Sequence, residues 1–343
     1  MQPVPSTQAS QSPVLPRSSQ PVYAALDLGT NNCRLLMGAR CGAGFRVMES
    51  FSRIVRLGEG LHETGRLSPL AMDRAVDALH ACANRLARRD VRGVRAIATE
   101  ACRRAANAPE FLDRVIRETG LTLEIISSRE EAELALESCT ALLAGDGRRF
   151  LLFDIGGGST ELVWVRTPGC RSGPDLIGYT SLRVGVVSLS ERFSETKFTS
   201  AGFDAMVAEI SSQLAAFEDV HRIAQEIRQG GVRLLGTSGT VTTLAGVILA
   251  LARYQRPLID GAVLSLQGAR DAVQTLRSMG RDGLIAHPCV GPDRVDFVLP
   301  GCAIFTAIAQ TWPAPTVTVA DRGLREGMLL RLIRGEPPAM RRA

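Results

Sequence analysis

The stretch at 154–161 reads Asp154-Ile155-Gly156-Gly157-Gly158-Ser159-Thr160-Glu161. Apolar runs at 151–153 and 162–165 flank it, which is the pattern of a strand, a tight polar turn and a second strand. The earlier stretch Asp27-Leu28-Gly29-Thr30-Asn31-Asn32 has the same arrangement between apolar residues at 22–26 and 35–37. Two hairpins of this kind, each with an aspartate at the end of its first strand, predict a duplicated α/β architecture whose halves face each other.

Between and after the hairpins, helical and strand patterns alternate. Apolar residues at helical spacing predict helices that start near 68 and 107, and others at about 128–143, 199–218, 240–251, 265–279, 295–310 and 323–334. Short apolar runs predict strands at 94–98, 123–126, 233–235 and 316–319. Strands separated by helices favour a mainly parallel sheet.

The length of the chain fits this duplication. Its 343 residues correspond to about two domains at roughly 150 residues each. We expect a disordered tail at 1–21, a first domain at 22–145, a second domain at 146–319 and a flexible tail at 336–343. The segment 320–335 is expected to pack back on the first domain as a helix.

Composition excludes several classes of protein. A formal net charge of +5 without long runs of like charge gives little support to a nucleic-acid-binding role. Lys197 is the only lysine and no glycine precedes it, so a Walker-type P-loop is excluded. The 8 cysteines include no C-x-x-C pair, and no run approaches the ~18 apolar residues of a membrane helix. We therefore expect a cytoplasmic protein with neither nucleic acid nor membrane as a partner.

Three glycine-rich segments can bind phosphate through backbone N–H groups and hydroxyls. They lie at 27–32, 156–160 and 236–240. The third segment, Gly236-Thr237-Ser238-Gly239-Thr240, also opens a helix, whose dipole favours anions. For any one segment, an ordinary structural turn is an equal alternative. Three such segments in one chain favour phosphate binding.

Carboxylates beside these segments can complete a metal site. Asp27 and Asp154 end strands and Glu161 follows the second turn, so their oxygens can bind magnesium. The alternative for both aspartates is a bond to their own turns. Glu131 also has two interpretations: with Ser128 it fits a capping box, and near a helix N-terminus it can face a cleft and accept a proton from water.

Together these motifs resemble those of the Ppx/GppA phosphatases, which are exopolyphosphatases and guanosine pentaphosphate phosphohydrolases of the actin-like ATPase superfold. The similar segments are, in order, 27–35, 98–107, 126–132, 154–161, 236–244 and 323–327. The stretch at 154–161 matches the family pattern without a change, whereas Thr30 and Asn32 replace two serines of the opening motif. The resemblance covers about 22–335, without the helical C-terminal extension of longer members. It implies a two-lobed fold with duplicated domains and an active-site cleft between them.

The resemblance also implies roles for individual residues. Glu131 would be the general base that deprotonates a water, and Arg103 would neutralise phosphate oxygens beside it. Asp154, Glu161 and Asp27 would hold Mg²⁺. The phosphate-binding residues would be Thr30, Asn31, Asn32, Arg34, Gly156, Gly157, Gly158, Ser159, Thr160, Gly236, Thr237, Ser238, Gly239 and Thr240.

The function expected on this basis is magnesium-dependent release of terminal orthophosphate from inorganic polyphosphate. Guanosine pentaphosphate is the alternative substrate, because it too presents a terminal phosphoanhydride. A sugar or acetate kinase of the same superfold and a non-catalytic nucleotide sensor are less favoured, since Arg103, Glu131 and Asp154 are all present. The sequence leaves open the preferred substrate, the chain length, activation by monovalent cations and the formation of a homodimer.

Overall fold

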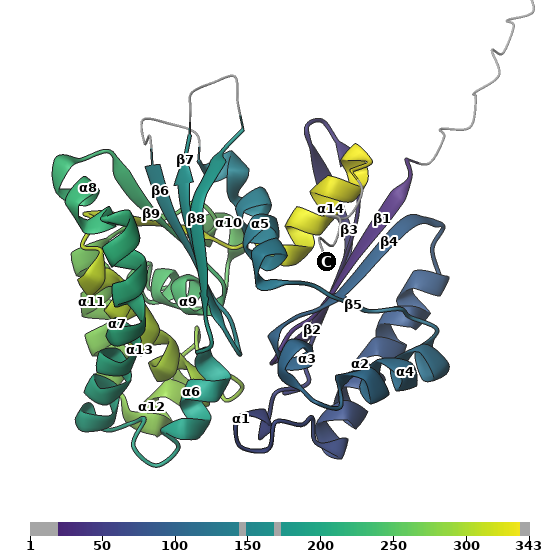
Figure 1. Cartoon of the computed structure of the whole chain (residues 1–343), viewed down its shortest axis with the longest axis horizontal. Helices are drawn as coiled ribbons and strands as arrows, with labels where there is room; N and C mark the ends of the chain where they lie inside the picture. Colours follow the sequence, from purple (N-terminus) through teal and green to yellow (C-terminus); the bar gives the residue numbers. More distant parts are fainter. Residues whose placement is uncertain (1–19, 144–148, 168–172, 337–343) are drawn as a thin grey trace, which may run out of the picture.

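A computed structural model describes residues 20–143, 149–167 and 173–336. Each of its two lobes is built around one β-sheet with helices packed against it (Figure 1). The predicted tails at 1–21 and 336–343, and the predicted boundary between 145 and 146, fall largely or wholly outside the described residues. The domain limits therefore stay a prediction.

The first lobe has five strands in the order β3-β2-β1-β4-β5. These strands are β1 (Val22–Leu28), β2 (Asn32–Cys41), β3 (Gly44–Ile54), β4 (Val91–Ala98) and β5 (Glu124–Ile125). Its helices are α1 (Leu61–Thr64), α2 (Pro69–Ala87), α3 (Glu100–Arg104) and α4 (Ala108–Thr119). Apolar side chains of α2 and α4 are buried with those of β1, β2 and β4 in one continuous core, which fixes the sheet against these two helices.

The second lobe has six strands in the order β10-β11-β9-β6-β7-β8. These strands are β6 (Arg149–Ile155), β7 (Thr160–Arg166), β8 (Asp175–Leu182), β9 (Val232–Thr237), β10 (Val263–Ser265) and β11 (Thr316–Ala320). The helices of this lobe are α6 (Val186–Arg192), α7 (Ser200–His221), α8 (Ile223–Gln229), α9 (Gly239–Ile248), α10 (Arg256–Ile259), α11 (Leu266–Ser278), α12 (Gly280–Ala286) and α13 (Val295–Thr311). The largest apolar core of the molecule lies between this sheet and α7, α9, α11 and α13.

Both sheets are mixed, so the prediction of a mainly parallel sheet is wrong. In the first sheet β1 pairs antiparallel with β2 and parallel with β4, and in the second β6 pairs antiparallel with β7 and parallel with β9. Strands joined by a tight turn must pair antiparallel, whereas strands joined through helices can run parallel. Each hairpin with a glycine-rich turn thus supplies one antiparallel pair inside its sheet, and β3, β8 and β10 add further antiparallel pairs.

Two helices lie between the lobes, namely α5 (Ser128–Cys139), which continues into the 3-10 turn η1 (Thr140–Leu142), and α14 (Leu324–Arg334) (Figure 1). They share a core with residues of both sheets. At their crossing, a Cβ on Gly327 would lie 2.2 Å from the backbone oxygen of Leu134, so only glycine allows this approach. The last helix also packs on β1 and β2.

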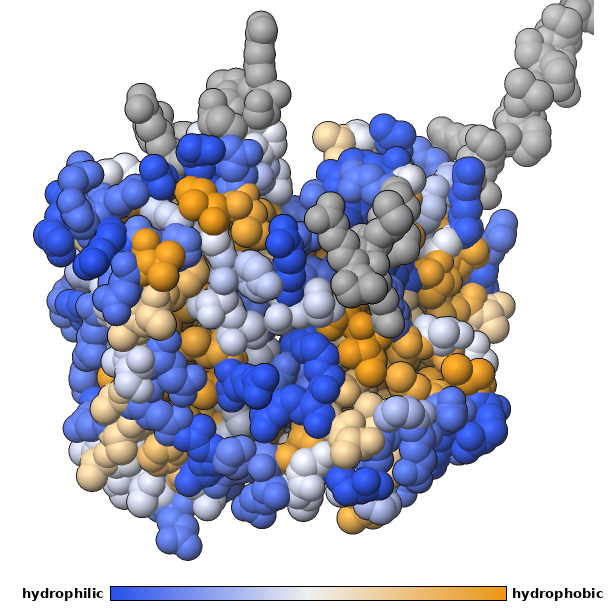
Figure 2. All heavy atoms as spheres, viewed as in Figure 1, coloured by the Kyte–Doolittle hydropathy of each residue, from blue (hydrophilic) through white to orange (hydrophobic). Residues whose placement is uncertain are grey.

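The face drawn in Figure 2 carries both hydrophilic and hydrophobic residues. Figure 2 shows strongly hydrophilic residues at the middle of one face, where the two lobes meet. Among the residues that the structure describes, no helix combines the length and the apolar character needed to span a membrane.

Candidate active site

The turns of the two predicted hairpins meet between the lobes. Each turn is closed by the same backbone bond, from Gly29 N to Asn32 O at 2.9 Å and from Gly156 N to Ser159 O at 3.0 Å. A Cβ on Gly158 would lie 2.5 Å from the hydroxyl oxygen of Thr30. The second turn therefore needs glycine because the first turn packs directly against it.

A cavity of about 110 Å³ lies between these turns. It is lined by Asp27, Gly29, Thr30, Asn31, Asn32, Arg34, Thr99, Glu100, Glu131, Asp154, Gly156, Gly157, Gly158, Ser159, Ser238, Arg322, Gly323 and Leu324. A larger cavity of about 510 Å³ adjoins it and shares Asn31, Asn32, Arg34, Gly156, Gly157 and Ser238 with it. The structure thus brings most of the predicted phosphate-binding residues to one place.

The third glycine-rich segment also reaches this place. Ser238, Gly239 and Thr240 line the larger cavity, and the 10-residue helix α9 begins at Gly239. Helix N-termini carry free N–H groups and favour anions. Ser238 has a φ of 80°, a left-handed conformation that is unusual for a residue with a side chain.

Three of the predicted phosphate-binding residues do not line either cavity, and their phosphate contacts stay a prediction. Thr160 is fully buried and donates its hydroxyl to the carbonyl of Val184 at 2.7 Å. Thr237 is equally buried and donates to the carbonyl of Arg322. Gly236 packs against Phe153, whose ring would be 2.6 Å from a Cβ at that position. All three residues shape the loops but do not line either cavity.

The two hairpins place different partners opposite their aspartates. In the register of the first hairpin Asp27 faces Arg34, whereas in the second Asp154 faces Glu161. Burial, partly offset by Arg34, raises the pKa of Asp154 to about 6. Burial and the neighbouring Asp154 raise the pKa of Glu161 to about 7. Two carboxylates thus lie close together beside the second turn, where a bound cation would lower their pKa values and stabilise their ionised forms.

The acidic residues fit a divalent cation only in part. Across 20–143, 149–167 and 173–336, no three His, Cys, Asp or Glu side chains lie close enough together to hold a metal ion. One carboxylate oxygen of Asp27 and the amide oxygen of Asn31 are nevertheless buried without a hydrogen-bond partner. Magnesium prefers one or two carboxylates plus water and phosphate oxygens, so it suits this donor set better than a cage of three carboxylates would.

Glu131 faces the smaller cavity and does not cap its helix. The residue that caps α5 is Ser127, whose hydroxyl accepts from Glu130 N at 3.1 Å. The helix cap is therefore one residue earlier than the predicted Ser128, and Glu131 takes no part in it. Burial and the neighbouring Glu161 raise the pKa of Glu131 well above its usual value, while Arg103 opposes this shift. A carboxylate of this kind can accept a proton near neutral pH.

Arg103 holds Glu131 in place. One guanidinium nitrogen lies 2.7 Å from the Glu131 carboxylate and donates to the carbonyl of Ile126 at 2.9 Å. The rest of the group donates to Glu100 at 2.9 and 3.1 Å. Sequence reasoning missed Glu100, although it lies inside the 98–107 motif next to Arg103. Its burial and its place in the cavity wall were not visible in the motif.

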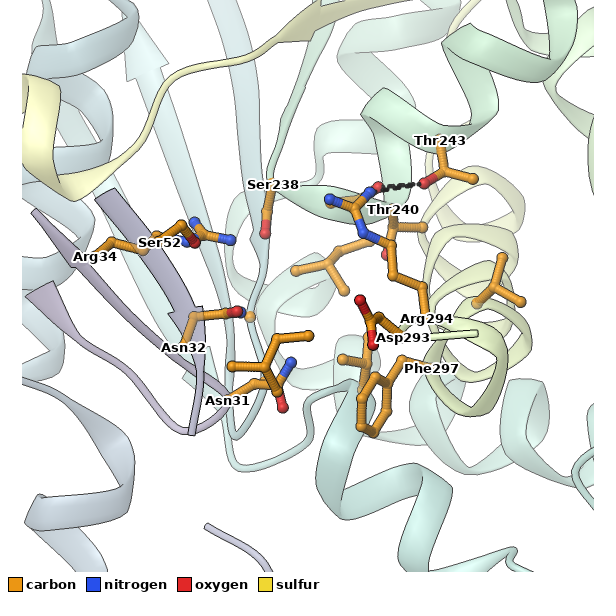
Figure 3. A pocket seen from close by; sticks show the side chains of 17 residues that line it. Asn31, Asn32, Arg34, Ser52, Ser238, Thr240, Thr243, Asp293, Arg294 and Phe297 are labelled. Atoms are coloured by element: carbon orange, nitrogen blue, oxygen red, sulfur yellow. Dashed lines mark hydrogen bonds between the residues drawn. The ribbon is translucent and has the colours of Figure 1, made fainter. Parts of the chain in front are cut away.

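The larger cavity extends the site toward α13. In Figure 3, Asn31, Asn32, Arg34 and Ser52 lie on one side of it, and Thr240, Thr243, Asp293, Arg294 and Phe297 lie on the other. Arg294 donates to the hydroxyl of Thr243 at 3.4 Å. Residues 293–297 were not predicted as part of the site, since no motif covers them. The fold places them beside the glycine-rich segments.

This geometry defines a class of protein: a two-lobed α/β protein with a cavity, lined by carboxylates and glycines, between two related turns. The family model described as "Ppx/GppA phosphatase family" matches residues 39–336. The chain belongs to the Ppx/GppA phosphatase family. The family and the two-lobed α/β fold predicted from the motifs are thereby confirmed.

Curated and solved relatives agree with this assignment. A protein of Aeromonas hydrophila named guanosine-5'-triphosphate,3'-diphosphate pyrophosphatase is 33% identical over 317 residues, which make up 92% of this chain and 60% of the relative. The chain therefore spans about 60% of the length of that relative. The solved Ppx/GppA family member of Aquifex aeolicus is 27% identical with a TM-score of 0.75, covering 92% of this chain and 98% of its own. A solved exopolyphosphatase-like protein is also 27% identical, with a TM-score of 0.82 and the same two coverages.

The raised pKa of Glu161 predicts how stability depends on pH in metal-free buffer. Glu161 is 2% exposed, and its pKa is about 7 in the folded protein against 4.5 for a free side chain. Between these values the folded protein retains a proton that the unfolded chain has lost, so this residue lowers the free energy of unfolding as the pH rises. Glu161→Gln, which can still accept from Ser181, should be more stable than the wild type by on the order of 3 kcal/mol at pH 8 and lose that advantage at pH 5.

Chemical denaturation at both pH values, with a chelator present, measures this difference. Exposed Glu195→Gln is the matched control and should show no comparable change. A Glu161→Gln advantage that is equal at pH 5 and pH 8 would contradict the raised pKa.

Proposed function

We propose that this chain hydrolyses the terminal phosphoanhydride bond of guanosine pentaphosphate, releasing orthophosphate. The observation that carries the proposal is the 510 Å³ cavity beside the phosphate loops, which has both apolar and polar walls. Its size and lining suit a nucleoside, whereas a purely phosphate-binding channel would not need an aromatic wall. The printed name of the Aeromonas hydrophila relative, which describes a guanosine nucleotide pyrophosphatase, supports the same choice.

In the proposed reaction Glu131 accepts a proton from a water molecule in the smaller cavity. The oxygen of that water attacks the terminal phosphorus, the bond from this phosphorus to the bridging oxygen breaks, and the shortened nucleotide leaves with the bridging oxygen. The water must be held in line with the leaving oxygen, and the backbone groups of the two turns suit this task. The raised pKa of Glu131 suits a base that works near neutral pH.

Positive charge for the phosphate oxygens would come from arginines. Arg34 lines both cavities, and Arg103 lies beside the base. Guanidinium groups bind phosphate oxygens through paired N–H donors. Mg²⁺ held by Asp154, with Glu161 or Asp27 as a second carboxylate, would supply further charge neutralisation. Phosphoryl transfer depends mainly on such positioning and charge stabilisation.

The guanosine is assigned to the larger cavity. Phe297 and Val186 provide apolar surface on which a purine can stack, and the exposed carboxylate of Asp293 can accept from the N–H groups of guanine. Arg294 lies beside them and can contact a second phosphate group.

Inorganic polyphosphate is the second candidate substrate. The smaller cavity is lined mainly by glycines and polar side chains and has no aromatic wall, and the three loop segments around it suit repeated phosphates. The name of one solved relative, an exopolyphosphatase-like protein, is consistent with this alternative. Purified protein should be given each substrate in turn, and the rates of phosphate release compared. The proposal fails if polyphosphate is hydrolysed and guanosine pentaphosphate is not.

Phe297→Ala distinguishes the two substrates within one protein. Stacking of a base on an aromatic ring is worth about 1–3 kcal/mol, so we expect the KM for guanosine pentaphosphate to rise about tenfold. The KM for polyphosphate, which has no base, should change less than twofold and serves as the internal control. An equal rise in KM for both substrates would show that the guanine does not stack on Phe297.

A further inference from the structure

A hydrogen bond joins the two lobes at the end of their interface opposite α5 and α14. Figure 1 shows α6 of the second lobe facing α1 of the first at this end. The carboxylate of Glu191 on α6 accepts from Gly60 N at 3.0 Å, across 131 positions of the chain. Neither residue lines the two cavities of the candidate active site.

On the first lobe, the segment that carries Gly60 is bonded directly to the first phosphate loop. Val55 N donates to Asn31 O at 2.8 Å, and Gly58 N donates to Thr30 O at 2.9 Å. A Cβ on Gly58 would lie 2.3 Å from the Thr30 methyl group, so the segment and the loop are in close contact. A displacement of Gly60 would therefore pull on the loop that contains Thr30 and Asn31.

On the second lobe, the start of α6 is bonded to the second phosphate loop in a similar way. Val186 N donates to Gly156 O at 3.0 Å, and Val187 N donates to Gly157 O at 2.8 Å. A Cβ on Gly185 would lie 2.4 Å from the backbone of Gly157, which leaves no room for sliding. Helix α6 thus moves with the loop that contains Gly156 and Gly157.

Glu191 is half-buried at this contact. The space between Gly58, Gly158 and Glu191 amounts to only about 10 Å³, at the lower limit for one water molecule. The second oxygen of Glu191 is buried without a hydrogen-bond partner among the described residues. A solvated surface carboxylate would not stay in such a position, so the bond to Gly60 is the interaction that compensates for its burial.

We infer that Glu191 is a positioning residue whose bond to Gly60 holds the two phosphate loops at the separation that binds substrate. This inference rests on the proposed function, because it assigns Glu191 a role in binding the phosphates between those loops. If the bond is lost, a smaller fraction of molecules has the loops in register before substrate arrives. The apparent affinity falls by that fraction, whereas saturating substrate restores the closed arrangement.

Glu191→Ala should therefore raise the KM for phosphate release about tenfold and change kcat less than twofold. The reason is that the loss of a hydrogen bond to a charged group changes an equilibrium constant by about tenfold or more. Glu191→Gln retains an acceptor oxygen and should restore KM to within threefold of the wild type. Exposed Glu195→Ala removes the same charge from the same lobe and should leave KM unchanged. A lower kcat at unchanged KM, or equal losses in the Ala and Gln variants, would overturn the inference.

Hydrogen exchange of the substrate-free protein tests the bond between Glu191 and Gly60 independently of any activity assay. Glu191→Ala should accelerate exchange in peptides that cover 55–60 and 185–190, and leave α2 unchanged. Unaltered exchange in both peptides would overturn the inference. If the wild type released no phosphate from either substrate, the proposed function would fail, while the exchange result would still decide whether Glu191 couples the loops.

Discussion

Glu131→Gln is expected to lower kcat by about 10²- to 10⁴-fold, which is the usual contribution of a positioned general base. The amide has nearly the shape of the carboxylate but cannot accept a proton from water. Because Ser127 caps α5, the substitution leaves the helix N-terminus intact. We therefore expect a melting temperature no lower than that of the wild type and a KM within about threefold of the wild type.

Glu130→Gln is the matched control for this variant. Glu130 is the neighbouring residue on α5, but its carboxylate pairs with Arg95 at 2.5 Å and does not line the cavities. Its loss should affect stability more than kcat. The assignment of the base would be falsified if Glu131→Gln kept more than a tenth of wild-type turnover.

The sequence predicted the elements whose patterns are local. Both hairpins were predicted because apolar runs meet glycine-rich turns in the sequence. These runs are apolar because strands such as β6 and β7 are buried along most of their length. Strand β3 was missed because none of its eleven residues is buried and polar residues interrupt any alternation. Strand β8 was missed for a related reason, since only Leu182 at its end is buried. The conformation of an edge strand depends on pairing with its neighbour, so its own sequence shows only a weak strand pattern.

The parts of the candidate site that are formed by backbone turns could be predicted from the sequence. The direction of individual side chains, which decides whether a residue lines the cavity, could not. Ser159, the last residue of the turn, lines the cavity, whereas the adjacent Thr160, the first residue of β7, turns to Val184. The motif contains both residues and cannot separate them. Phe297 and Glu191 were not predicted at all, because tertiary packing alone brings their segments to the two hairpins.

Arg103→Ala is expected to lower kcat/KM by about 10²- to 10³-fold at pH 7, which is typical of losing a buried charge that stabilises a transition state. The substitution has a second effect on the base itself. Arg103 opposes the burial that raises the pKa of Glu131, so its removal raises that pKa further. A larger share of the base is then protonated and inactive at neutral pH, and the acidic limb of the pH profile moves upward.

The pH profile of Arg103→Ala separates these two effects. Activity that rises again by about tenfold between pH 7 and pH 9 would indicate that Arg103 acts partly by keeping Glu131 ionised, since deprotonation at higher pH replaces that function. The remaining deficit at pH 9 measures the part of the effect that does not depend on the ionisation of Glu131. Arg104→Ala is the control, because Arg104 lies only 4.0 Å from the same Glu100 but makes no contact with Glu131 in the described part of the chain. If both variants lost activity equally at every pH, the effect would be one of net charge, and the assignment of Arg103 to the reacting centre would be wrong.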